Sequence, residues 1–257
     1  MPKKKQWETD EDGEKVMSLS GHLRELRNRV VVCLVFLFAG FVLCFSNAEL
    51  IVNELSAMGL ANGYVFVYLS PQELLVQYMR VGLTGALIIS IPVIVYEAYA
   101  FIAPGLEKYE KPFLILSLIF GQICFVLGVA FAHKISMPFM LGFLYKINGT
   151  DYITSSISIE SYLSFVLMVY IIFGIVFEMP VVSAILTKFG LLKSAWLKKG
   201  RSFAIVLCFI VAALITPPDI ISQIMVAIPM MILYQLSIII CRVIEKFNRK
   251  KSSLRER

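Results

Sequence analysis

Long apolar segments alternate with short polar segments along this chain of 257 residues. The apolar core of a bilayer is about 30 Å thick, and a helix needs roughly 20 mostly apolar residues to cross it. The pattern therefore predicts an all-α membrane protein with six transmembrane helices. The six segments are Val30–Phe45, Leu74–Ala98, Phe113–Ala132, Tyr162–Leu186, Phe203–Ile215 and Ile220–Ile240.

The fifth apolar segment, Phe203–Ile215, is the shortest. It spans only about 20 Å as a helix, and the turn Thr216–Asp219 alone links it to the sixth segment. Two explanations fit. Either the bilayer thins or the turn lies in a water-filled concavity, or Lys199 and Arg201 extend the span by reaching the lipid–water interface.

Basic residues lie almost entirely on one side of this predicted arrangement. All but three of the 24 lysines and arginines fall before the first segment or within the stretch that ends at Arg29, in the loops after the second and fourth segments, or in the stretch from Arg242 to the C-terminus. The exceptions are Arg80, Lys134 and Lys146. Cytoplasmic loops of membrane proteins are enriched in Lys and Arg, so both termini are predicted to be cytoplasmic.

Composition and charge narrow the function classes. The chain is 58% hydrophobic and 16% charged, which excludes an ordinary soluble domain. Its net charge is +6, but the basic residues lie between the apolar segments and at both termini, without the aromatic-interleaved basic face expected for nucleic-acid binding. The five cysteines all lie in or at the ends of apolar segments, so neither disulfides nor a metal site is expected. No cofactor is implied.

Residues 1–20 form a charged leader that we expect to be disordered. The membrane domain is assigned to residues 21–245, and residues 246–257 form a basic cytoplasmic tail. Between the first two spans, Asn47–Leu69 has apolar residues at helical spacing. We expect an amphipathic helix there, lying along the extracytoplasmic membrane surface.

Two polar turns resemble helix starts. Ser70-Pro71-Gln72-Glu73 combines a capping hydroxyl, a proline at the first helical position and a Glu placed to return a hydrogen bond. The turn Thr216–Asp219 repeats that pattern before the sixth segment.

Glu178 is a carboxylate within an otherwise apolar segment. Charge at membrane depth is costly and typically marks a pathway, a proton relay or a partner contact. Pro180 removes a backbone donor two residues later, so we expect the helix to kink beside the acid. The alternative is a carboxyl that is simply protonated or paired with a neighbouring helix.

Two further carboxylates lie in the predicted cytoplasmic region. Glu25 precedes Arg29 by four residues, the spacing of a helix-surface ion pair. Glu110 follows a Pro-Gly break in the next cytoplasmic loop. Carboxylates on a basic face bind cationic groups, and they hold a guanidinium better than an ammonium because it binds bidentately.

Several motifs occur together in this order: HLRELRNR, SPQE, FIAPGLEKYE, YLSFVL with FGIVFEMP, and TPPDIISQ. With this set the chain resembles the TatC family, the multispanning receptor subunits of the twin-arginine protein translocase. The resemblance covers roughly Gly21–Glu245. It implies six helices in a concave, glove-like bundle, with short fifth and sixth helices and cytoplasmic termini in the bacterial inner membrane.

The resemblance also implies roles for individual residues. Glu25 and Glu110 recognise the paired arginines of twin-arginine signal peptides, and Arg27 and Phe101 lie in the same patch. Glu178, beside Pro180, is the intramembrane contact for the single-span subunits TatA or TatB.

The resemblance further implies a role in protein export. The chain is then a receptor for folded cargo, part of a multimeric Tat complex powered by the proton-motive force, and not an enzyme. Asp219 and Gln223 belong to the segment opening the sixth span, where a helix cap already explains Asp219. Glu97 and Glu107 depart from the family pattern. Glu97 either strengthens the cationic-peptide site or only reaches water.

Two other function classes compete with the receptor. A proton-coupled transporter would use Glu178 and Asp219 as relay groups, but it needs repeat symmetry that the sequence lacks. An intramembrane hydrolase would need a second membrane aspartate, a Ser–His pair at depth or an HExxH motif, and none is present. The receptor interpretation is favoured.

Overall fold

The computed structural model describes residues 7–9, 15–17, 19–102, 111–148, 156–216 and 219–255. Helices dominate these ranges, and the strands among them are short. The helices are α1 (Leu19–Ser46), α2 (Ala48–Ala61), α3 (Glu73–Ile102), α4 (Lys111–Phe131), the π-helical η2 (Ala132–Ser136), α5 (Met137–Asn148), α6 (Ile159–Phe177), α7 (Met179–Lys188), α8 (Ser194–Lys199), α9 (Arg201–Ile215) and α10 (Ile220–Arg255). The strands are β1 (Trp7–Thr9), β2 (Lys15–Met17), β3 (Val65–Val67) and β4 (Ser156–Ser158).

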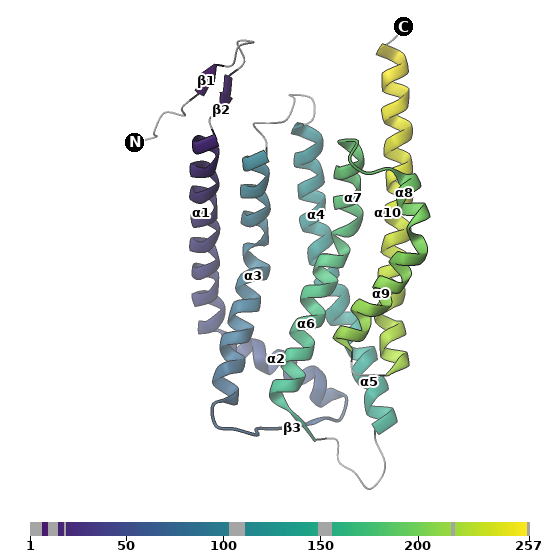
Figure 1. The fold of residues 1–257 in the computed structure, drawn as a ribbon. Helices are drawn as coiled ribbons and strands as arrows, with labels where there is room; N and C mark the ends of the chain where they lie inside the picture. The colour runs from purple at the N-terminus through teal and green to yellow at the C-terminus, as the bar shows by residue number, and fades with distance from the viewer. Residues whose placement is uncertain are drawn as a thin grey trace.

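The long helices run side by side between two ends of a bundle (Figure 1). The start of α1 and the end of α10 lie at the same end, which we call the termini end. At the opposite end, the loop end, α2 crosses beneath the bundle, and β3 lies close by. Helices α3 and α7 approach the termini end with their C-terminal residues, and α4 starts there.

Five helical stretches are long and apolar enough to cross a membrane: Gly21–Ser46, Glu73–Phe101, Lys111–Lys146, Ile159–Lys188 and Ile220–Asn248. Each contains most or all of one predicted apolar segment. The remaining segment forms the 15-residue helix α9, which is shorter than these. The prediction of six spans therefore stays a prediction for α9.

One expectation about helix length is wrong. The last helix was expected to be short, but α10 has 36 residues. The polar residues after Ile240 continue the same helix, because Arg, Glu and Lys are good helix formers. Only the apolar part of α10 matches the predicted sixth segment.

The core of the bundle surrounds α6. Half of the most apolar window in Ile159–Lys188 is buried, against 11% of the corresponding window in α1. Tyr162, Leu163, Val166 and Phe173 are almost completely buried on α6. Helix α1 packs mainly on α3, α4 packs on α6, and α7 packs on α10. Large apolar side chains on α1 stay exposed, as expected for a surface that faces lipid.

At the loop end, α2 packs on the core through Val52 and Leu55. The Tyr162 hydroxyl donates a hydrogen bond of 2.6 Å to the Leu55 carbonyl. The helix predicted within Asn47–Leu69 is present as α2, and the residues after it form β3, which pairs in parallel with β4. Its placement along a membrane surface stays a prediction.

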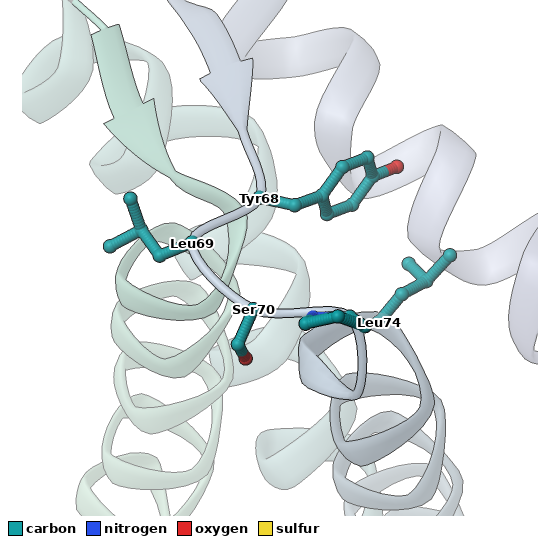
Figure 2. Close-up of a pocket in the computed structure, with 5 residues that line it drawn as sticks. Tyr68, Leu69, Ser70 and Leu74 are labelled. Carbon is teal, nitrogen blue, oxygen red and sulfur yellow. The ribbon is translucent and has the colours of Figure 1, made fainter.

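Of the two predicted helix starts, Ser70–Glu73 carries the returned hydrogen bond that we expected. The other differs, because the Thr216 hydroxyl donates to the Ala212 carbonyl of α9 at 3.0 Å and Asp219 itself caps α10. Glu73 accepts from the Ser70 N–H at 3.3 Å, at the start of α3. The Asp219 carboxylate accepts from the Ser222 N–H at 2.7 Å, at the start of α10. A pocket lined by Tyr68, Leu69, Ser70, Pro71 and Leu74 lies beside the first of these turns (Figure 2).

The described part of the leader includes two short paired strands, and the expected disorder of residues 1–20 stays a prediction. Strand β1 pairs antiparallel with β2, with Trp7 opposite Met17. The membrane-domain and tail boundaries at residues 21, 245 and 257 stay predictions.

Candidate functional site

A cluster of charged groups joins α1 to α3 near the termini end. The Arg29 guanidinium donates through Nη2 to Glu25 Oε1 at 2.6 Å and through Nη1 to Glu97 Oε2 at 2.7 Å. Its Nη2 also donates to the Ala100 carbonyl at 2.9 Å. We call these groups the guanidinium cluster: Arg29, the Glu25 and Glu97 carboxylates, and the Ala100 carbonyl.

Helix geometry explains how the cluster forms. Glu25 and Arg29 lie four residues apart on one face of α1, where side chains meet. Glu97 and Ala100 lie three apart on one face of α3, which packs against α1. The Arg29, Glu25 and Glu97 side chains are 21%, 13% and 15% exposed, so the cluster is largely shielded but still reaches solvent.

The sequence left two interpretations of Glu97 open, and the cluster excludes one of them. The Glu97 side chain does more than extend into water, because it forms an ion pair with Arg29, which lies 68 residues earlier in the sequence. The expected Glu25–Arg29 pair is also present. The bridging role of Arg29 could not be predicted from the sequence, because it depends on the packing of α1 against α3.

Phe101 lies beside the cluster. Its ring stacks on the His22 ring with centroids 4.2 Å apart, and it directly follows Ala100 in α3. Arg27 is exposed on α1. Glu107 and Glu110 lie outside the described residues, so the predicted pairing of Glu25 with Glu110 stays a prediction.

Glu178 lies in a break between α6 and α7. Helix α6 ends at Phe177 and α7 begins at Met179, with Pro180 in its first turn. The helix is therefore interrupted beside the acid, as its sequence predicted. The Glu178 carbonyl accepts hydrogen bonds from the N–H groups of Val181 and Val182 at 3.0 and 2.9 Å.

The Glu178 carboxyl lies directly against Gly121 of α4. A Cβ atom at Gly121 would lie 2.8 Å from Glu178 Oε2, closer than real side chains approach. Among the described residues, none donates a hydrogen bond to this carboxyl, although it is partly buried. Gly121 was not identified from the sequence, because a glycine in an apolar helix carries no signal of what it faces.

Asp219 and Gln223 organise the turn between α9 and α10. Asp219 caps α10 through the Ser222 N–H. The Gln223 side chain donates from Nε2 to the Phe209 carbonyl of α9 at 3.0 Å. Both contacts lie within the fold, in agreement with the capping role inferred for Asp219.

Among the described residues, no group of three or more His, Cys, Asp or Glu side chains is arranged to hold a metal ion. All five cysteines are free thiols.

A family model described as Sec-independent protein translocase protein (TatC) matches residues 21–229. The chain belongs to the TatC family. The TatC protein of Helicobacter pylori strain 26695 is 37% identical over 230 residues, covering 88% of each chain. The Aquifex aeolicus TatC is 34% identical over 244 residues, covering 93% of this chain and all of the relative.

The fold agrees with this assignment. A crystal structure titled as the twin-arginine translocase receptor TatC superposes with a TM-score of 0.79 at 34% identity. The match covers 87% of this chain and 99% of that structure. This TatC family member is thus a membrane component of the Sec-independent protein translocase and not an enzyme.

Proposed function

We propose that this TatC family member is the receptor that binds twin-arginine signal peptides of folded precursor proteins. It further recruits single-span TatA and/or TatB subunits, and the proton-motive force powers export. The guanidinium cluster is the observation that carries this proposal. Two carboxylates from different helices converge on one guanidinium there, so this part of the bundle has the chemistry that an arginine pair requires.

Glu25 is the principal carboxylate of the signal-peptide site in this proposal, and Phe101 and Arg27 flank it. Glu110 completes the site from the loop that follows α3. A guanidinium presents several N–H groups in a rigid fork, whereas an ammonium presents a point charge. The site therefore prefers Arg to Lys at both peptide positions.

A peptide-binding assay tests this proposal. The full-length protein in detergent would be titrated with a labelled twin-arginine peptide and with the same peptide carrying Lys-Lys. We expect the Arg-Arg peptide to bind more tightly, and Glu25→Gln and Glu110→Gln each to weaken it. Equal binding of both peptides to the wild type would exclude an arginine receptor.

Glu178 is proposed to contact TatA or TatB within the membrane. Its carboxyl accepts no hydrogen bond from the described residues, and Gly121 leaves room beside it. An unpaired polar group in lipid is costly, so a polar side chain from a partner helix would stabilise it. Pro180 supports the same contact, because it lies in the first turn of α7 beside the helix break at Glu178.

We further propose a location in the bacterial cytoplasmic membrane, with both termini in the cytoplasm. Both ends of the described chain lie at the termini end of the bundle (Figure 1). The Lys-rich and Arg-rich segments then face the cytoplasm, in agreement with the distribution of basic residues in membrane proteins. Self-association within a multimeric Tat complex is part of the same proposal.

A further inference from the structure

The guanidinium cluster already holds an arginine, and that arginine belongs to the protein itself. Arg29 Nη1 and Nη2 each contact one carboxylate, at 2.7 and 2.6 Å. The chain thus shows, with its own side chain, that Glu25 and Glu97 lie close enough to share one guanidinium.

The Arg29 guanidinium holds each of these two carboxylates through a single nitrogen, Nη2 for Glu25 and Nη1 for Glu97, and neither of them bidentately. A guanidinium that binds a carboxylate through two parallel N–H groups forms a stronger pair. The exposed fractions of the three side chains leave the cluster reachable from solvent. It is therefore open to exchange with an incoming guanidinium.

Resting on the proposed receptor function, we propose that Arg29 is an internal occupant of the arginine site and that a signal-peptide arginine displaces it from Glu25 and Glu97. Glu97 is then a binding residue in its own right. The exchange keeps both carboxylates paired, so binding never leaves two like charges uncompensated at a partly buried position.

This exchange explains how the site distinguishes arginine from lysine. Arg29 bridges Glu25 and Glu97 with two different nitrogens of one planar group. A lysine ammonium is a single charged atom and does not reproduce this fork. A peptide lysine therefore fails to compete with Arg29, whereas a peptide arginine offers the same contacts.

The same exchange lowers the apparent affinity for peptide. When an internal partner occupies a site for most of the time, the apparent Kd for the ligand equals the intrinsic Kd divided by the fraction of time for which the site is empty. With the internal pair formed about 90% of the time, removing Arg29 would tighten binding about tenfold. A residue that merely supports the carboxylates would act in the opposite direction.

The test measures peptide affinity of the full-length protein in detergent, using a fluorescent twin-arginine peptide. Arg29→Gln is compared with Arg24→Gln, which removes the same charge from an exposed position on the same helix. We expect Arg29→Gln to tighten binding about tenfold and to exceed the effect of Arg24→Gln. Weaker binding by Arg29→Gln would overturn the exchange, because it would make Arg29 a positioning residue.

Glu97→Gln tests the second part of the proposal. We expect it to weaken binding of the peptide at least fivefold, both alone and in the Arg29→Gln background. Unchanged affinity in that double variant would place Glu97 outside the site. Arg29→Lys retains the positive charge but lacks the planar guanidinium. It therefore provides a second test if Arg29→Gln does not fold. We expect Arg29→Lys to tighten binding less than Arg29→Gln, and weaker binding than wild type would contradict the exchange.

The wild-type protein separates this inference from the proposed function. A wild type that does not prefer the Arg-Arg peptide over the Lys-Lys peptide refutes the receptor function itself. A wild type with that preference, combined with an Arg29→Gln variant of unchanged or weaker affinity, refutes only the internal occupant.

Discussion

The carboxylate of Glu73 accepts a hydrogen bond of 2.6 Å from the Ser158 hydroxyl, although the two residues lie 85 positions apart. The same oxygen, Oε1, accepts from the Glu160 N–H at 3.0 Å, and Oε2 accepts from the Leu69 N–H at 2.7 Å. One carboxylate therefore satisfies donors at the start of α3 and at the start of α6. A negative charge is favourable there, because helix N-termini carry partial positive charge.

Removing this carboxylate should destabilise the loop end. Glu73→Ala removes the acceptor of the half-buried Ser158 hydroxyl and Leu69 N–H, and each hydrogen bond to a charged group is worth roughly 1.5–3 kcal/mol. We expect the free energy of unfolding to fall by about 3 kcal/mol or more, measured by denaturant or thermal unfolding in detergent. Glu49→Gln, at an exposed acid on α2, is the matched control and should change stability by less than about 0.5 kcal/mol.

Glu178 should tolerate an amide better than an alanine. Glu178→Gln keeps the volume and the hydrogen-bonding ability of the side chain, so partner cross-links and export should be largely retained. Glu178→Ala removes both and should lose the cross-links to TatA or TatB at this depth, while signal-peptide binding survives. A proton relay would require the acid itself. An inactive Glu178→Gln variant with intact partner contacts would therefore contradict the contact role.

Gly121→Ala tests independently whether the position of the Glu178 carboxyl matters for the partner contact. The new Cβ would lie 2.8 Å from Glu178 Oε2 and displace it. Ala is a better helix former than Gly by up to about 1 kcal/mol, which offsets part of the cost to stability. We expect cross-links to partner helices to decrease while the unfolding temperature changes little. Gly142→Ala, whose Cβ would lie 3.2 Å from Asn62 Oδ1, is the control and should leave the cross-links unchanged.

Single cysteines introduced at four sites test the proposed orientation. We expect membrane-impermeant reagents to label Asn62→Cys and Asn148→Cys from outside the cell. Lys193→Cys and Ser252→Cys should be labelled only after the membrane is opened. Labelling of Lys193→Cys in intact cells would reverse the assignment based on basic residues.

Much of the fold could be predicted from the apolar segments and from the residues that begin helices. The segments around Tyr162–Leu186 and Leu74–Ala98 became helices close to their predicted bounds, because lipid leaves a helix as the only stable form for such a single segment. The helix break at Pro180 was foreseen for a covalent reason, the missing N–H. The acid at Asp219 was likewise recognised as a cap from its turn.

Contacts between distant segments were not predictable from one sequence. The pairing of Arg29 with Glu97 depends on how α1 and α3 rotate against each other, which local patterns do not specify. The same holds for the room that Gly121 makes for Glu178. The length of α10 was misjudged for a different reason, since a charged helix continues beyond the apolar segment when its residues favour helix.

The low burial of α1 has a consequence for how the protein is assembled in the membrane. Only 11% of its most apolar window is covered by the rest of the chain, and its main neighbour is α3. Because α1 precedes α3 in the chain, it is synthesised before the helix that forms its main contact. The Arg29 contact with Glu97 forms only after the ribosome has made residues up to Ala100 and α3 has inserted beside it. The guanidinium cluster can therefore form only when both α1 and α3 are inserted. A shorter chain that ends before α3 lacks Glu97 and Ala100 and so has no such cluster.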